Sequence, residues 1–73
     1  MQVELIIKQV RERKGISLRE LEDLTGIDRQ RLSNIENKKV ELEKISFIEM
    51  LVIAENLAVK ITELFIVRHI EIQ

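Results

Sequence analysis

The chain has 73 residues, no cysteine and a formal net charge of −1, from 12 Lys and Arg against 13 Asp and Glu. This length allows a single domain over residues 1–73, and the lack of cysteine excludes a disulfide framework or a thiolate metal site. The near-zero charge argues against a polybasic coat for nucleic acid or membranes. The apolar runs are too short to cross a bilayer. Because Glu4 interrupts any basic leader, we expect a cytoplasmic protein.

The first half of the chain predicts three helices, separated by two glycines. The first helix ends at Gly15, because glycine is favoured just past a helix end. The second opens at Ser17, which is spaced from Glu20 as in a capping box. The third begins after the N-cap residue Asp28 and ends near residues 37–39. The inner faces of the second and third helices are expected to hold Leu18, Leu21, Leu24, Leu32 and Ile35.

The second half predicts a longer helix, a short helix and a tail. Ser46 and Glu49 form a second capping-box pattern, which opens a fourth helix extending to about Leu57. A short fifth helix is expected near residues 61–65. The tail, residues 66–73, fits either a helix extension or a β-strand. The core face of the fourth helix is expected to hold Phe47, Met50, Leu51 and Ala54.

The second and third helices together, residues 17–37, form a candidate helix-turn-helix. A tight turn containing Gly26 separates them, and their apolar residues would hold them at a steep angle. The outer side chains of the third helix would then project from a rigid frame. A projecting helix fits the major groove of DNA, where Arg, Gln and Asn can read base edges. The pattern therefore indicates DNA binding.

Several short stretches follow a known pattern in the expected order. They are Val10-Arg11-Glu12-Arg13-Lys14-Gly15-Ile16-Ser17, Glu20-Leu21, Gly26-Ile27, Leu32-Ser33-Asn34-Ile35-Glu36-Asn37, Ala54-Glu55-Asn56-Leu57-Ala58-Val59 and Glu63-Leu64-Phe65. On these stretches, residues 7–65 resemble the Cro/repressor-type helix-turn-helix family, also called the Xre family. The resemblance implies an all-α, compact five-helix lambda-repressor-like domain. It also implies a sequence-specific regulator of transcription, of repressor type, that binds double-stranded DNA.

The resemblance assigns roles to individual positions. The expected base contacts are Arg29, Gln30 and Asn34. The expected contacts to the DNA backbone are Ser17, Arg19, Arg31, Ser33, Lys38 and Lys39. Arg11 and Glu36 match a structural ion pair between the first helix and the end of the recognition helix. The competing interpretation of the polar face is an ordinary solvated helix surface.

Three departures from the family pattern affect these expectations. Leu18 stands where the family usually has Gln, which removes one anchor to the DNA backbone. Lys38 replaces the common glycine after the recognition helix, and lysine tolerates positive φ poorly, so we expect this turn to differ in shape. The connector, residues 40–45, is longer than usual and lacks the common proline, so no contacts are transferred to it.

Ile45, Ile48 and Val52 form an apolar stripe, and related domains usually carry polar residues at the last two positions. One interpretation is extra core, closed by the tail folding back. The other, which we favour, is a homodimer surface built from Ile48, Val52, Ile66, Ile70 and Ile72. A two-fold dimer would place two recognition helices about 34 Å apart on a palindromic operator. In that dimer the tail could pair as β-strands across the axis.

The alternative function is an antitoxin-like or adaptor module that holds a protein partner with the apolar flank of the fourth helix and the tail. An enzyme is not expected, because the sequence has no cysteine nucleophile and no Gly-rich phosphate loop. No cofactor or metal is expected, since His69 is the single histidine. Few aromatics argue against single-stranded RNA. Residues 1–39 hold nine basic and seven acidic groups and residues 40–73 hold three and six, so basic charge is concentrated at the proposed DNA face.

Overall fold

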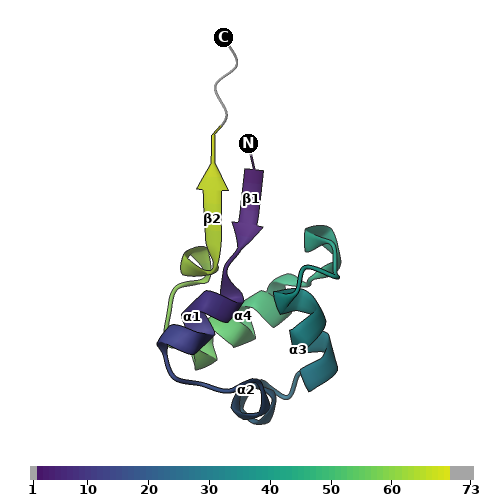
Figure 1. Ribbon diagram of the computed structural model, residues 1–73, viewed down its shortest axis with the longest axis vertical. Helices are drawn as coiled ribbons and strands as arrows, with labels where there is room; N and C mark the ends of the chain where they lie inside the picture. Colours follow the sequence, from purple (N-terminus) through teal and green to yellow (C-terminus); the bar gives the residue numbers. More distant parts are fainter. Residues whose placement is uncertain (1, 70–73) are drawn as a thin grey trace.

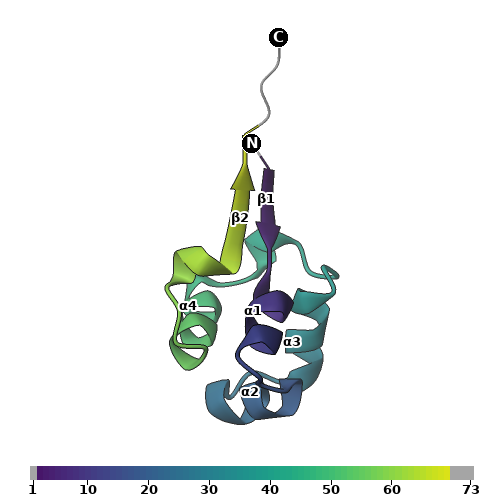
Figure 2. The same cartoon turned by 60° about the vertical axis from the view of Figure 1, so that its left-hand side comes forward.

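The computed structural model describes residues 2–69 of the chain. This part contains four α-helices and a two-stranded ribbon (Figure 1). The helices are α1 (Ile7–Arg13), α2 (Leu18–Thr25), α3 (Arg29–Glu36) and α4 (Phe47–Asn56). Two 3-10 turns, η1 (Leu42–Lys44) and η2 (Ile61–Leu64), precede and follow α4. The strands are β1 (Gln2–Leu5) and β2 (Phe65–Arg68). The ribbon stands away from the helices along the long axis of the molecule (Figures 1 and 2).

Short-range signals define the helix ends. The Ser17 Oγ accepts a hydrogen bond from the Glu20 amide at 3.1 Å, and the Glu20 carboxylate accepts one from the Ser17 amide at 3.2 Å. Ser46 and Glu49 exchange the same two bonds at 3.0 Å each. Both predicted capping boxes are therefore confirmed. Gly26 ends α2 at φ 74°, a conformation that glycine adopts without steric cost.

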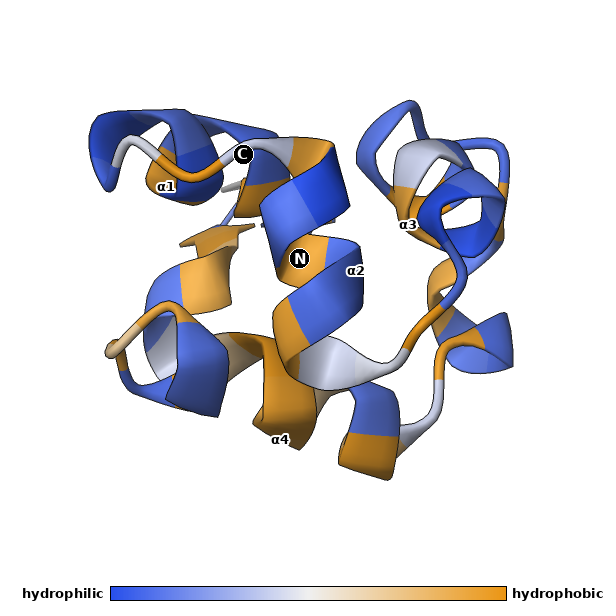
Figure 3. Ribbon diagram, turned by 90° about the horizontal axis from the view of Figure 1, so that it is seen from below, coloured by the Kyte–Doolittle hydropathy of each residue, from blue (hydrophilic) through white to orange (hydrophobic). Residues whose placement is uncertain are grey.

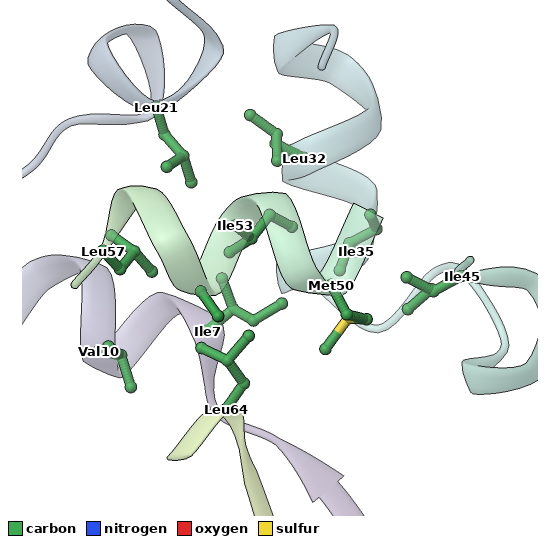
Figure 4. Close-up of a cluster of buried hydrophobic side chains, with 11 residues drawn as sticks. Ile7, Val10, Leu21, Leu32, Ile35, Ile45, Met50, Ile53, Leu57 and Leu64 are labelled. Atoms are coloured by element: carbon green, nitrogen blue, oxygen red, sulfur yellow. The ribbon is translucent and has the colours of Figure 1, made fainter. Parts of the chain in front are cut away.

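The hydrophobic core lies where the helices meet, and α4 crosses its centre (Figure 4). The fully buried side chains come from α1, α2, α3, the end of α4 and η2. They are Ile7, Val10, Leu21, Leu32, Ile35, Ile53, Leu57 and Leu64. Burial of apolar surface contributes about 25 cal/mol per Å², so these contacts are the main stabilising term of this small domain.

The buried face of α4 differs from the predicted one. Phe47 and Leu51 were expected in the core, but Phe47 is 66% exposed and Leu51 is also exposed. The residues that face inward are Met50, Ile53, Ala54 and Leu57. At about 100° per residue these four share one arc of the helix, which Phe47 and Leu51 border on one side. Leu24 in α2 was likewise expected inside and is exposed.

The β-ribbon corrects the expected all-α, five-helix class. β1 and β2 pair antiparallel, with Leu5 opposite Phe65 and Gln2 opposite Arg68. The predicted fifth helix is only the 3-10 turn η2. The tail was expected to be either a helix extension or a β-strand. The start of it is a strand, because residues 65–68 form β2, and β2 pairs with β1 of the same chain. Ile70 and Ile72 lie outside the described residues.

The turn after α3 keeps a glycine-like path although a lysine occupies it. Lys38 has φ 60°, in the left-handed region. The amide of Lys39 donates to the Asn34 carbonyl at 2.8 Å, which closes the end of α3. The expectation that lysine would avoid this conformation is therefore wrong.

Ile53 and Ile48 provide a matched test of the core, because they are the same residue type on opposite sides of α4. Ile53 is 0% exposed and Ile48 is 64% exposed. We expect Ile53→Ala to lower the free energy of unfolding by about 2–5 kcal/mol, through lost burial and a new cavity. Ile48→Ala should change it by less than about 0.5 kcal/mol. Urea unfolding followed by circular dichroism measures both, and equal losses would contradict the described orientation of α4.

Candidate nucleic-acid interface

α2 and α3 are joined by a short turn that is ordered by side-chain hydrogen bonds. The Thr25 hydroxyl donates to the Leu21 carbonyl at 2.7 Å and accepts from the Ile27 amide at 3.1 Å. Ile27 packs against the core, and Gly26 supplies the positive φ that reverses the chain. The turn therefore holds α2 and α3 in one fixed relation, as a helix-turn-helix requires.

Two carboxylates bind the first amides of α3. Asp28 accepts from the Gln30 amide at 2.6 Å, which confirms its predicted role as N-cap. Glu22 of α2 accepts from the Arg29 amide, also at 2.6 Å. These amides have no partner inside the helix, and negative charge is favourable at a helix start. The Glu22 contact ties α2 directly to α3, and sequence analysis missed it because it depends on the angle between the helices.

The outer surface of α3 gathers the predicted base-reading residues. At about 100° per residue, Gln30 and Asn34 lie opposite the buried Leu32 and Ile35, and Arg29 lies at the edge of this outer arc, on the side of Leu32. Arg29 and Gln30 are exposed, and the Gln30 side-chain amide donates to Asn34 Oδ1 at 3.1 Å. Figure 3 shows α3 as a largely hydrophilic helix. A groove beside this arc is lined by Leu18, Glu22, Asp28, Arg29, Gln30 and Ser33.

Arg31 lies outside that arc, and its side chain bonds to α4 and η1. Its guanidinium forms two hydrogen bonds of 3.0 Å with the Glu49 carboxylate and one of 2.8 Å with the Lys44 carbonyl. The hydrogen bonds from Arg31, with those at Ser46, lower the pKa of Glu49 to about 2. Arg31 therefore has a structural role, fixing α3 to α4, that sequence analysis missed. Its predicted contact with the DNA backbone stays a prediction.

Arg11 and Glu36 join α1 to the end of α3. Arg11 Nε and Nη2 donate to the two Glu36 carboxylate oxygens at 2.7 and 3.0 Å. Arg11 Nη1 donates to the Ile16 carbonyl at 2.8 Å, and the Glu36 side chain is 3% exposed. Hydrogen bonding to Glu36 raises the pKa of Arg11. This bidentate geometry satisfies a pair that would otherwise be costly to bury.

The other predicted DNA-backbone residues lie at the start of α2, on α3 and in the turn after it. Ser17 caps α2, and Arg19 and Lys39 are exposed. Ser33 accepts a hydrogen bond from the Asn37 side chain at 3.2 Å. The Lys38 ammonium pairs with Glu4 of β1 at 2.9 Å.

The residues of the predicted dimer surface lie on separate elements. Ile48 is exposed on the first turn of α4, where the unpredicted Phe47 and Leu51 extend the exposed apolar surface. Val52 is half-buried, and Ile66 is exposed in the ribbon. α4 packs on α2 and η2, whereas β2 packs on β1 and η2. Ile45, the first residue of the stripe, is buried in the core.

This arrangement defines a class of protein, the helix-turn-helix domains that bind DNA. The family model described as Helix-turn-helix (HTH_3) matches residues 7–64, most of the chain. The chain belongs to this family, and the resemblance to its Cro/Xre type is confirmed; the protein is therefore a DNA-binding regulator in general terms. The comparison with curated proteins yields no match.

None of the helices within residues 2–69 has the length and apolar character that crossing a membrane requires. The same residues contain no cluster of three or more His, Asp or Glu side chains that could hold a metal ion.

The pair between Arg31 and Glu49 predicts an acid-sensitive contribution to stability. The pKa of Glu49 is lowered to about 2 in the folded protein, so the contribution is complete above the ordinary carboxylate pKa of 4.5. It is lost as the pH falls from there towards 2. Glu49→Gln removes the charge while its amide oxygen can still accept from Ser46. We expect this substitution to lower the free energy of unfolding by roughly 1 kcal/mol at neutral pH, and by less in acid.

Urea unfolding of both proteins at several pH values measures this difference. Glu55→Gln, on the same helix, is the control for the loss of a carboxylate. The free energies of unfolding of Glu49→Gln and of the unsubstituted protein should converge as the pH falls. A difference that stays constant would contradict the role of the Arg31–Glu49 pair.

Proposed function

We propose that the protein is a sequence-specific regulator of transcription, of repressor type, that binds double-stranded DNA with α3 in the major groove. The observation that carries this proposal is the outer arc of α3. Arg29, Gln30 and Asn34 share it, and its helix is bonded to α1, α2 and α4. A polar helix held on three sides presents its side chains in one fixed orientation. Such preorganisation reduces the entropy lost on binding.

The three side chains have complementary hydrogen-bonding chemistry. Arg29 can donate two hydrogen bonds to O6 and N7 of guanine, and Gln30 or Asn34 can pair with N6 and N7 of adenine. The hydrogen bond between Gln30 and Asn34 orders both amides in the free protein. Reading a base exchanges this bond for bonds to the base edge. The proposed recognition therefore favours a site containing guanine and adenine.

The proposed backbone contacts position the helix and carry no sequence information. Arg19 near the start of α2 and Lys39 in the turn after α3 are exposed and supply positive charge. The net charge of −1 limits attraction to DNA in general. We therefore expect non-specific binding that is modest and decreases steeply with salt.

We also propose that the protein acts as a homodimer on a palindromic operator. Support comes from Phe47, Ile48 and Leu51, which form an exposed apolar surface on α4. A two-fold dimer buries the same surface of both copies, and an uncharged apolar surface opposes no like charges in that arrangement. The same surface supports the second candidate function, an antitoxin-like or adaptor module, if a different protein occupies it.

The role of the reading arc is tested by selecting bound sites from a random duplex library. We expect the unsubstituted protein to enrich a palindromic motif. Arg29→Ala with Gln30→Ala should reduce discrimination at least tenfold, because each bidentate base contact contributes about 1–3 kcal/mol. The matched control is Lys8→Ala with Gln9→Ala, which also removes one positive charge and one side-chain amide, from the exposed face of α1. Selectivity that survives in the Arg29/Gln30 variant would contradict the proposal.

The α4 surface is tested by sedimentation of the protein without DNA. Ile48→Glu places a charge in the proposed interface, and a buried unpaired charge is costly, so we expect a shift from dimer to monomer. Lys8→Glu, on the exposed face of α1, is the control and should remain dimeric. A dimer that persists in Ile48→Glu would exclude this surface. A monomer bound by one stoichiometric protein partner would favour the adaptor function.

A further inference from the structure

Glu4 in the β-ribbon binds the lysine that follows the recognition helix. The Lys38 ammonium lies 2.9 Å from Glu4 Oε1, and the Arg68 guanidinium lies 3.4 Å from Glu4 Oε2. Glu4 and Lys38 are 34 residues apart in the chain, so the contact exists only because the fold places β1 beside the turn after α3. Neither helix packing nor the capping of α3 requires it.

The backbone on both sides of this pair is fixed. Glu4 lies in β1 opposite Ile66, and Arg68 of the same ribbon lies 3.4 Å from its second oxygen. Lys38 is fixed by its left-handed backbone and by the hydrogen bond from the Lys39 amide to Asn34. Glu4 and Lys38 also line the same groove between β1 and the connector. The two charges therefore face each other through defined backbone positions.

We propose that Glu4 competes with DNA phosphate for Lys38 and so limits the affinity of the protein for the DNA backbone. This inference rests on the proposed function, in which the turn after α3 meets phosphate groups. Contact with a phosphate requires Lys38 to leave Glu4. It also leaves a carboxylate beside a polyanion, and both effects oppose binding.

Glu4 remains charged under the conditions in which the protein would bind DNA. The hydrogen bond from Lys38 and the nearby positive charges hold the pKa of Glu4 below its ordinary value. Because phosphate contacts supply most non-specific affinity, a restrained lysine weakens binding to all sequences. Base contacts are unaffected, so the contribution of Arg29, Gln30 and Asn34 becomes a larger share of the total. The pair thus favours selective over general binding.

The test measures affinity for a fluorescent duplex of mixed sequence, by anisotropy, over ~50–200 mM salt. Glu4→Gln should bind about two- to fivefold more tightly, the range expected for the loss of an exposed ion pair. Glu55→Gln is the matched control, since it makes the same change of net charge on α4. Lys38→Met should reduce the slope of log affinity against log salt by about 0.9, the value for one phosphate contact.

A double variant isolates the pair. In the Lys38→Met background, Glu4→Gln should gain less affinity than it gains when Lys38 is present, because there is no lysine left to release. Circular dichroism shows whether each variant is folded, and both Glu4 and Lys38 contact solvent, so folding should persist.

The outcomes separate this inference from the proposed function. If the unsubstituted protein binds the duplex but Glu4→Gln and Glu55→Gln bind equally, the competition is overturned and the proposed function stands. An unchanged salt slope in Lys38→Met overturns it as well, because Lys38 then meets no phosphate. Failure of the unsubstituted protein to bind any duplex overturns the proposed function together with this inference.

Discussion

The constraint on which the rest of the structure depends is that α3 must keep one side polar and exposed. In a helix of eight residues this leaves only Leu32 and Ile35 for the core. Two apolar side chains do not fix the rotation of a helix, so polar contacts supply the remaining restraint. Glu22 holds its first turn, the Arg31–Glu49 pair its middle and the Arg11–Glu36 pair its end. The position of the reading surface is therefore determined by polar contacts at the start, the middle and the end of α3.

These contacts make the helix-turn-helix part of one unit with the remaining helices. Glu49 both caps α4 through Ser46 and binds Arg31, so the start of α4 and the middle of α3 are fixed together. Arg11 also binds the carbonyl of Ile16, just before α2. Each of these two ion pairs thus joins two helices and a third segment of the chain, η1 at Lys44 or the turn at Ile16. Removal of one partner would leave a charge unpaired and affect several elements, which is costlier than the loss of an isolated surface pair.

Features that depend on neighbours a few residues away could be predicted from the sequence. The two capping boxes, the N-cap Asp28 and the glycine at the end of α2 are of this kind, and all are confirmed. The pairing of β1 with β2 could not be predicted, because a strand of four residues carries little signal and its partner is distant. The rotation of α4 was missed since its apolar residues surround most of the helix. The structural bonds of Arg31 depend on α4 and η1, and no local pattern indicates them.

The ribbon has a further consequence for how the fold forms. Its strands are the two ends of the described chain, with the whole helical body between them. Closing so long a loop is entropically unfavourable, and a two-stranded ribbon alone is marginally stable. Leu5 and Phe65 pack against the core at the base of the ribbon, so the folded helices supply the surface on which it forms. The contact between Glu4 and Lys38 therefore depends on the folded helical body, so the charge beside the recognition helix is set by a long-range pairing of the two ends of the described chain.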